Sequence, residues 1–148
     1  MITARVVVEP SSISLDGTRP ATGDITLLLG SESFPAVGWN DFIIVILTGW
    51  ASALHRLALG TSQYERVYFM EGPYEVQLRR AGPETFALRA LERPRWERAL
   101  VEVDAIPLIE SVVHGGTDVL AICRAAQHRS TDVERLEATV NSLRELTG

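Results

Sequence analysis

The feature that most constrains this fold is a long region, residues 66–103, in which apolar and polar residues alternate. Three short segments, each containing a proline, interrupt the alternation, and they are typical of turns. Four stretches of period two joined by such short turns predict four antiparallel strands in a meander. The expected strands cover residues 66–70, 74–80, 85–91 and 96–103.

The two central strands of this meander predict an apolar face and a polar face. Side chains alternate between the two faces of a sheet, so residues of equal parity share a face. The apolar face is expected to hold Tyr74, Val76, Leu78, Phe86, Leu88 and Ala90, and the polar face Glu75, Gln77, Arg79, Ala87 and Arg89. One face should therefore cover a core and the other should meet solvent.

Residues 42–59 predict a helix that is buried on most of its sides. Its polar residues Thr48, Ser52, His55 and Arg56 form one narrow stripe. We expect Asn40 or Asp41 to cap its first turn and Gly60 to end it in the left-handed conformation. The uncharged part, residues 42–54, is shorter than the roughly 20 residues that cross a bilayer, which favours a core helix.

The two ends of the chain predict further strands and helices. Alternation in residues 2–9, 13–15 and 24–29 favours three strands, with connectors at residues 16–23 and 30–38. Apolar residues at helical spacing from Ile109 to Ala126 predict a second helix. Within that helix, Gly115 and Gly116 either break it or allow a close crossing. A third helix is expected to start at Thr131, with Glu134 completing a capping box.

These elements predict a single α+β domain over residues 1–148. We expect an antiparallel sheet of about six or seven strands, packed against one buried central helix and two C-terminal helices. The chain's 148 residues suffice for such a core without disulfides or metal.

Composition excludes several functions. All fourteen basic residues are Arg, so the chain has no lysine, and Schiff-base catalysis and a P-loop lysine are excluded. The acidic residues number nineteen. The net charge of −5 argues against a general nucleic-acid binder. A single cysteine and no pattern of a signal peptide predict a cytoplasmic protein that is not a membrane protein.

No motif in the sequence predicts a catalytic, cofactor-binding or metal site. The three histidines, His55, His114 and His128, are far apart in sequence and lack zinc-ligand spacing. Cys123 continues the apolar stripe of its helix, which favours a packed structural thiol. We therefore expect a protein that is not an enzyme and uses no cofactor.

Charge distribution gives the candidate site. Residues 66–98 hold seven Arg and five acidic residues, whereas the segments on both sides are acidic overall. Arg is a common interface anchor, so we predict that Arg79, Arg89 and Arg98 share an outer sheet face and bind a protein partner with an acidic surface. The alternative is a solvated sheet face without a partner.

Three segments resemble a known group of proteins: residues 34–42 (FPAVGWNDF), 69–74 (FMEGPY) and 119–124 (VLAICR). The chain resembles, over residues 34–146, small and mostly uncharacterised bacterial proteins, some of which are similar to immunity proteins of polymorphic toxin systems. The resemblance implies a cytoplasmic accessory protein that binds a partner and needs no cofactor. It carries over no active-site residue.

Three function classes stay open at this point. The first is a protein-binding module, with toxin neutralisation as one form of that function. The second is a small-molecule-binding or enzymatic protein with a pocket between the sheet and helix 42–59, and the third is a homo-oligomeric structural subunit. A cavity of roughly 300 Å3 or more lined by His55 and a carboxylate would favour the second class.

Overall fold

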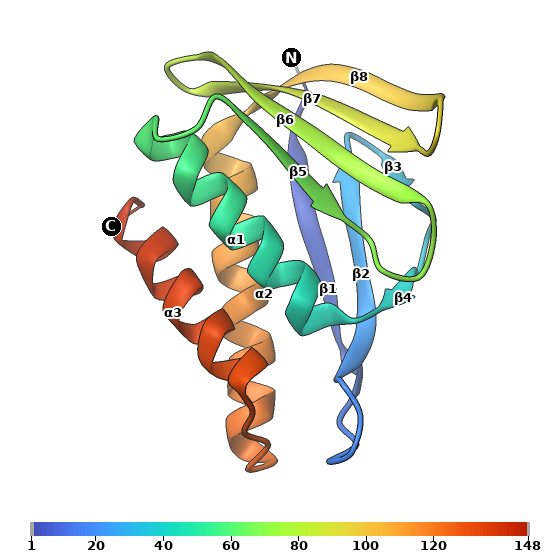
Figure 1. Cartoon of the computed structure of the whole chain (residues 1–148), viewed down its shortest axis with the longest axis vertical. Helices are drawn as coiled ribbons and strands as arrows, with labels where there is room; N and C mark the ends of the chain where they lie inside the picture. Colours follow the sequence, from blue (N-terminus) through green and yellow to red (C-terminus); the bar gives the residue numbers. More distant parts are fainter. Residues whose placement is uncertain (1, 148) are drawn as a thin grey trace.

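The computed structural model describes residues 2–147 and confirms the α+β class, with eight strands and three helices (Figure 1). The strands form two antiparallel sheets of four strands each, where we expected one sheet of six or seven strands. The elements are β1 (Ala4–Ser14), β2 (Thr22–Leu29), β3 (Glu32–Phe34), β4 (Asn40–Asp41), α1 (Ile43–Leu59), β5 (Tyr64–Tyr68), β6 (Tyr74–Gly82), β7 (Thr85–Glu92), β8 (Trp96–Asp104), α2 (Ala105–Ala125) and α3 (Thr131–Glu145).

The first sheet contains β1, β2 and two short strands, β3 and β4, which both pair with β2. We expected two strands where the single strand β1 runs, because Pro10 and two serines interrupt the alternation. The register of β1 against β2 shifts between Glu9 and Ser14, so the interruption is an irregularity within one strand. The Ser12 hydroxyl donates to the Glu9 carbonyl at 2.6 Å and accepts from the Asp24 amide at 2.7 Å. The first bond lies within β1, and the second joins β1 to β2 through the irregularity.

The second sheet is the expected meander, in the order β5-β6-β7-β8. Its inner face holds buried residues such as Val76, Leu78 and Leu88, as the alternation predicted. The amide of Ile2, just before β1, donates to the carbonyl of Glu102 in β8 at 3.2 Å. This contact joins one edge of the second sheet to the start of the first sheet.

Helix α1 is the central core element that the sequence predicted. Nine of its residues are buried, including Trp50 at 1% exposure. Gly60 ends the helix with φ of 78°, in the left-handed region that favours glycine. The expected side-chain cap is wrong, because Phe42 is the N-cap and no side chain caps the first turn. Asp41 instead accepts from the Phe42 amide and from other donors described below.

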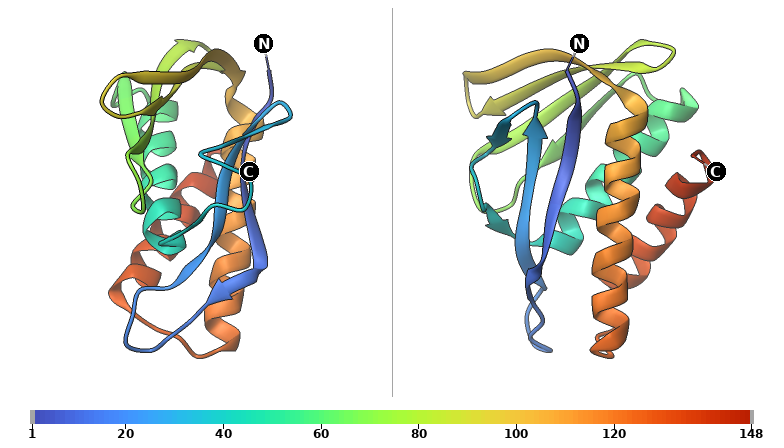
Figure 2. Two further views of the ribbon diagram at one scale, coloured as in Figure 1. Left: turned by 90° about the vertical axis from the view of Figure 1, so that its right-hand side faces the viewer. Right: turned by 180° about the vertical axis from the view of Figure 1, so that it is seen from behind.

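Helix α2 runs without a break through Gly115 and Gly116, which resolves the two alternatives in favour of a close crossing. A Cβ atom at Gly116 would lie 2.6 Å from Val140 Cγ2 of α3. A Cβ atom at Gly115 would lie 3.0 Å from Val8 Cγ2 of β1. The glycine pair therefore lets α2 approach both β1 and α3, between which it lies (Figure 2).

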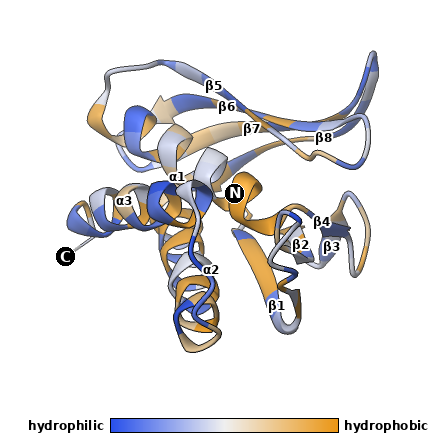
Figure 3. Ribbon diagram, turned by 60° about the horizontal axis from the view of Figure 1, so that its bottom comes forward, coloured by the Kyte–Doolittle hydropathy of each residue, from blue (hydrophilic) through white to orange (hydrophobic). Residues whose placement is uncertain are grey.

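Helix α3 begins at Thr131, as expected, but its cap is the residue before the expected one. Ser130 is the N-cap, and its hydroxyl accepts from the Val133 amide at 3.2 Å, so the capping role assigned to Thr131 is wrong. Leu136, Val140 and Leu143 of α3 are fully buried. Figure 3 shows hydrophobic residues along β1 and on α2, which contact each other in the core.

Candidate functional site

The candidate site is the outer face of the second sheet, which points away from the helices. Cross-strand pairing places its side chains in three rows across β5 to β8. The rows are Tyr64–Arg79–Ala87–Glu102, Arg66–Gln77–Arg89–Leu100 and Tyr68–Glu75–Leu91–Glu97. We call these twelve residues the outer face. Arginine and tyrosine, which this surface holds, are enriched at protein interfaces.

Tyr64, on the edge strand β5, contacts two arginines of this face. The guanidinium groups of Arg66 and Arg79 lie 5.5 Å and 6.0 Å from the centre of its ring, within the range of a cation–π contact. Arg66 Nε also donates to the Tyr64 hydroxyl at 2.8 Å. This hydrogen bond, followed by that to Tyr68, raises the pKa of Arg66 above its ordinary value. Arg66 is therefore a fixed positive charge held between two tyrosines.

Arg79 and Arg89 line an open depression of about 260 Å3 on the outer face. Leu100, which is 65% exposed, and Tyr64 also line it. Arg89 Nε lies 2.7 Å from Glu97 Oε1, so its charge is matched within the sheet. Within residues 2–147, Arg79 has no carboxylate oxygen within 4 Å. The depression thus combines an apolar surface with one guanidinium that has no acidic partner.

Arg98 does not lie on the outer face, which corrects the expectation that three arginines share it. Ala90 pairs with Ala99 and Leu91 pairs with Glu97, so Arg98 is the extra residue of a bulge in β8. A bulge interrupts the alternation of side chains. The Arg98 guanidinium lies 5.9 Å from the ring of buried Phe34, toward the first sheet. It also forms an ion pair with Glu92 at 3.4 Å.

Two carboxylates are nearly buried. Glu75, at 5% exposure, lies on the outer face and accepts from Gln77 Nε2 at 3.3 Å, with Arg66 Nε at 3.9 Å. Asp41, at 1% exposure, accepts from four N–H groups: Phe42 N at 2.7 Å, Trp39 Nε1 at 2.8 Å, Met70 N at 3.0 Å and Glu71 N at 3.1 Å. Both carboxylates thus accept hydrogen bonds from neighbouring groups. Asp41 has the role of a structural clamp between the start of α1 and the β5–β6 turn.

The other candidate groups are dispersed. The cavity that includes His55 lies between α1 and α3, has a volume of about 190 Å3, and has no carboxylate among its lining residues. His114 lies 3.4 Å from Asp118 on the surface. Cys123 is buried, and burial raises the pKa of its thiol. No cluster of three or more His, Cys, Asp or Glu side chains suited to a metal ion occurs in the part of the chain that the structure describes.

Tyr64 and its neighbours on β5 were missed by the sequence analysis. The alternation Tyr64–Glu65–Arg66–Val67–Tyr68 already contains the signal, since the exposed positions are all aromatic or basic. The predicted strand covers residues 66–70, whereas β5 begins at Tyr64, so Tyr64 lay outside the prediction. The structure adds Tyr64, Arg66 and Tyr68 to the candidate site.

Comparison with known proteins found no matching family, no similar curated protein and no similar solved structure. The resemblance to immunity proteins therefore stays a prediction. Among residues 2–147, α2 is the one helix with the length and composition to cross a membrane. Nine of its residues are buried against the rest of the protein, which is typical of a core helix in a soluble protein.

Proposed function

We propose that this protein is a non-enzymatic binding module whose outer face binds an acidic surface of a protein partner. The observation that carries the proposal is Arg79, which stands beside Tyr64 in an open depression and has no carboxylate within 4 Å among the described residues. An acidic side chain of a partner would supply the missing charge. Tyrosine and arginine are, with tryptophan, the residue types enriched among interface hot spots.

The three predicted arginines have different roles in this proposal. Arg79 and Arg89 lie in the depression and contact the partner directly. Arg98 lies 5.5 Å from the ring of Trp96, which is 63% exposed. Arg98 thus contributes at the rim of the sheet, where a partner that extends over the β7–β8 turn would meet both residues.

We further propose a cytoplasmic, immunity-like role, in which the partner is a toxin that the protein neutralises without a cofactor. The resemblance of three segments to such proteins supports this finer proposal. The alternative of a small-molecule site between the sheet and α1 has less support, because the side chains there are closely packed. Trp50, Val67 and Leu78 are each exposed by 2% or less.

The test starts from partners captured from an extract of the source organism and identified by mass spectrometry. Association rates of a captured partner are then measured for the double variant Arg79→Glu/Arg89→Glu. The control is Arg5→Glu/Arg19→Glu, which makes the same charge change at exposed positions outside the site. We expect slower association for the first variant alone. Added salt should slow the wild type, since the Debye length is about 8 Å at physiological ionic strength.

Equal association rates for the two double variants would contradict the use of this face. The toxin-neutralising role has its own test. Expression of the captured partner should inhibit growth, and co-expression of this protein should restore it. A captured partner that leaves growth unaffected would contradict the immunity-like role while leaving the binding function in place.

A further inference from the structure

Strand β5 is an edge strand, and one hydrogen bond shows which of its residues bond to β6. The Phe69 amide donates to the Tyr74 carbonyl at 3.0 Å, so Phe69 and every second residue before it bond to β6. In an antiparallel pair the intervening residues direct their N–H and C=O groups away from the partner strand. These residues are Tyr64, Arg66 and Tyr68. Their main-chain groups therefore point out of the sheet.

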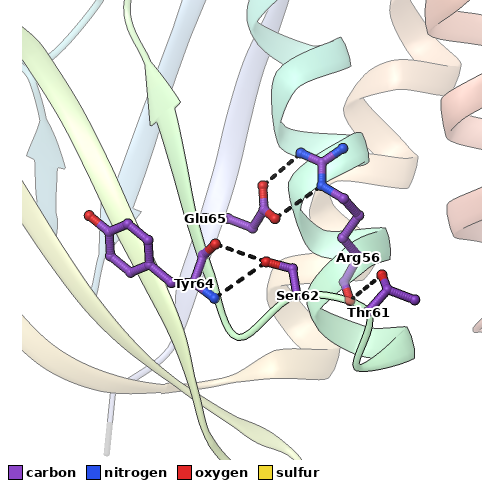
Figure 4. A network of polar contacts seen from close by, with 5 residues as sticks. All are labelled: Arg56, Thr61, Ser62, Tyr64 and Glu65. Carbon is purple, nitrogen blue, oxygen red and sulfur yellow. Dashed lines mark hydrogen bonds and ion pairs between the residues drawn. The ribbon is translucent and has the colours of Figure 1, made fainter.

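Two of these three residues have no main-chain partner. The Ser62 hydroxyl donates to the Tyr64 carbonyl at 2.9 Å and accepts from the Tyr64 amide at 3.4 Å, which caps the edge at that point (Figure 4). The opposite edge of the sheet is capped at Glu102 by Ile2. Within residues 2–147, nothing comparable bonds to the outward amides and carbonyls of Arg66 and Tyr68.

Helix α1 contacts β5, and its Arg56 side chain forms an ion pair with Glu65 of that strand. Gly49 of α1 lies next to β5, and a Cβ atom placed there would contact only Val67, at 3.9 Å. The helix thus presents no side chain at this position that covers the edge. Sheet edges with unpaired main-chain groups are templates for pairing with another strand.

The charges around the edge favour an acidic strand. Arg66 lies 3.9 Å from Glu75, at the limit of an ion pair, and Arg79 has no carboxylate within 4 Å in the described part of the chain. Arg93 lies over the Tyr68 ring at 5.3 Å, likewise without a carboxylate partner among residues 2–147. Three guanidinium groups therefore lie near an edge that offers two unpaired sets of main-chain donors and acceptors.

We propose that the partner supplies an extended acidic peptide segment, which adds to β5 as a fifth strand of the second sheet. This inference rests on the proposed function and names the form that the partner takes. Main-chain bonds would form with Arg66 and Tyr68, as in β-augmentation. Alternate side chains of the added strand lie on the outer face, about 5 Å from those of β5, so acidic residues there reach Arg66.

The probe for this test is a fluorescein-labelled synthetic heptapeptide of alternating Glu and Val. Two control peptides differ in one property each: one has Lys in place of Glu, and the other has N-methylated Glu amides. Binding is measured by fluorescence anisotropy, and amide hydrogen exchange locates it. We expect the acidic peptide to bind and to protect the amides of Arg66 and Tyr68. Both control peptides should bind at least about tenfold more weakly, through loss of charge or of main-chain bonds.

A pair of protein variants separates main-chain from side-chain binding. Arg66→Pro removes the outward N–H, and because that group points away from β6, the sheet itself loses no hydrogen bond. Arg66→Ala removes the same side chain and keeps the N–H. We expect Arg66→Pro to bind the acidic peptide about tenfold more weakly than Arg66→Ala, with circular dichroism as the check on folding. If Arg66→Pro fails to fold, the N-methylated peptide tests the same bonds on the wild type.

Three results would overturn strand addition. They are no binding of the acidic peptide to the wild type, equal binding of the methylated and unmethylated peptides, and a concentration-dependent dimer that Arg66→Pro dissociates. The last result would assign the edge to a second copy of this chain. None of them contradicts the proposed function, which fails only if charge reversal at Arg79 and Arg89 leaves partner association unchanged.

Discussion

Asp41 offers the sharpest test of how the two halves of the structure are held together. Its Oδ2 atom accepts from Trp39 Nε1, Met70 N and Glu71 N, and its Oδ1 atom accepts from Phe42 N. At 1% exposure, little water can replace these bonds. One side chain therefore ties the start of α1 to the turn between β5 and β6.

Asp41→Asn is the informative substitution, because it keeps the shape of the side chain and removes acceptors. The amide oxygen is best placed where Oδ2 lies, which leaves the NH2 group facing the Phe42 N–H. Three charge-assisted bonds become neutral ones and one bond becomes a contact between two donors. At about 0.5 kcal/mol for each of the three weakened bonds and about 1–2 kcal/mol for the lost one, we expect a destabilisation of about 3 kcal/mol.

Equilibrium unfolding in urea measures this loss, and thermal unfolding should show a midpoint lower by about 6–12 °C for a chain of this size. Hydrogen exchange at the amides of Met70 and Glu71 should accelerate locally. Asp24→Asn is the matched control, since the Asp24 carboxylate accepts from Asn40 Nδ2 at an exposed position. Its expected effect is below about 0.5 kcal/mol. Indistinguishable unfolding free energies for the two variants would refute the clamp.

Three further predictions concern packing and titration. Gly116→Ala should lower the free energy of unfolding in urea by about 1–3 kcal/mol, because the added methyl group overpacks against Val140. The loss should be much smaller in a Val140→Ala background. Equal losses in both backgrounds would contradict the close crossing. The hydrogen bond from Arg56 lowers the pKa of Glu65 in the folded protein. The ion pair therefore stabilises the fold at pH values above about 4.3, the ordinary pKa of a glutamate. This stabilisation is lost as the pH falls through the lower pKa that Glu65 has in the folded protein. Because Arg56 is half-exposed, Glu65→Gln should cost less than about 1 kcal/mol at pH 7, and stability curves should converge in acid; a constant difference would argue against the ion pair. Cys123→Ala should lower the free energy of unfolding by about 1–2 kcal/mol. The thiol is buried and its pKa is raised, so it should react slowly with iodoacetamide at pH 7. Rapid labelling of the folded protein would contradict a packed thiol.

The sequence predicts those parts of the fold that depend on local periodicity. Val76, Leu78 and Leu88 are buried on one face because alternation in a strand directs them there whatever the neighbouring elements are. Gly60 ends α1 because its φ of 78° is strained for other residues. Arg79 and Arg89 share the outer face for the same reason of parity. These predictions need no knowledge of tertiary contacts.

The parts that were not predicted depend on partners far away in the chain. Arg98 sits in a bulge, and a bulge inverts the side-chain alternation without a signature in composition. Asn40 or Asp41 was expected to cap α1, because both side chains can accept from the free N–H groups of a first helical turn. The actual donors to Asp41 include Met70 N and Glu71 N, about thirty residues away.

The adjacent glycines of α2 limit which substitutions relatives of this protein can accept at these positions. Gly115 approaches Val8 of β1 and Gly116 approaches Val140 of α3, so each position is coupled to a different element. In relatives of this protein, a larger residue at either position should appear together with a smaller one at its own contact. Correlated substitution at positions 8 and 115, and independently at 116 and 140, would then identify chains that share this three-element contact, even where overall sequence similarity has been lost.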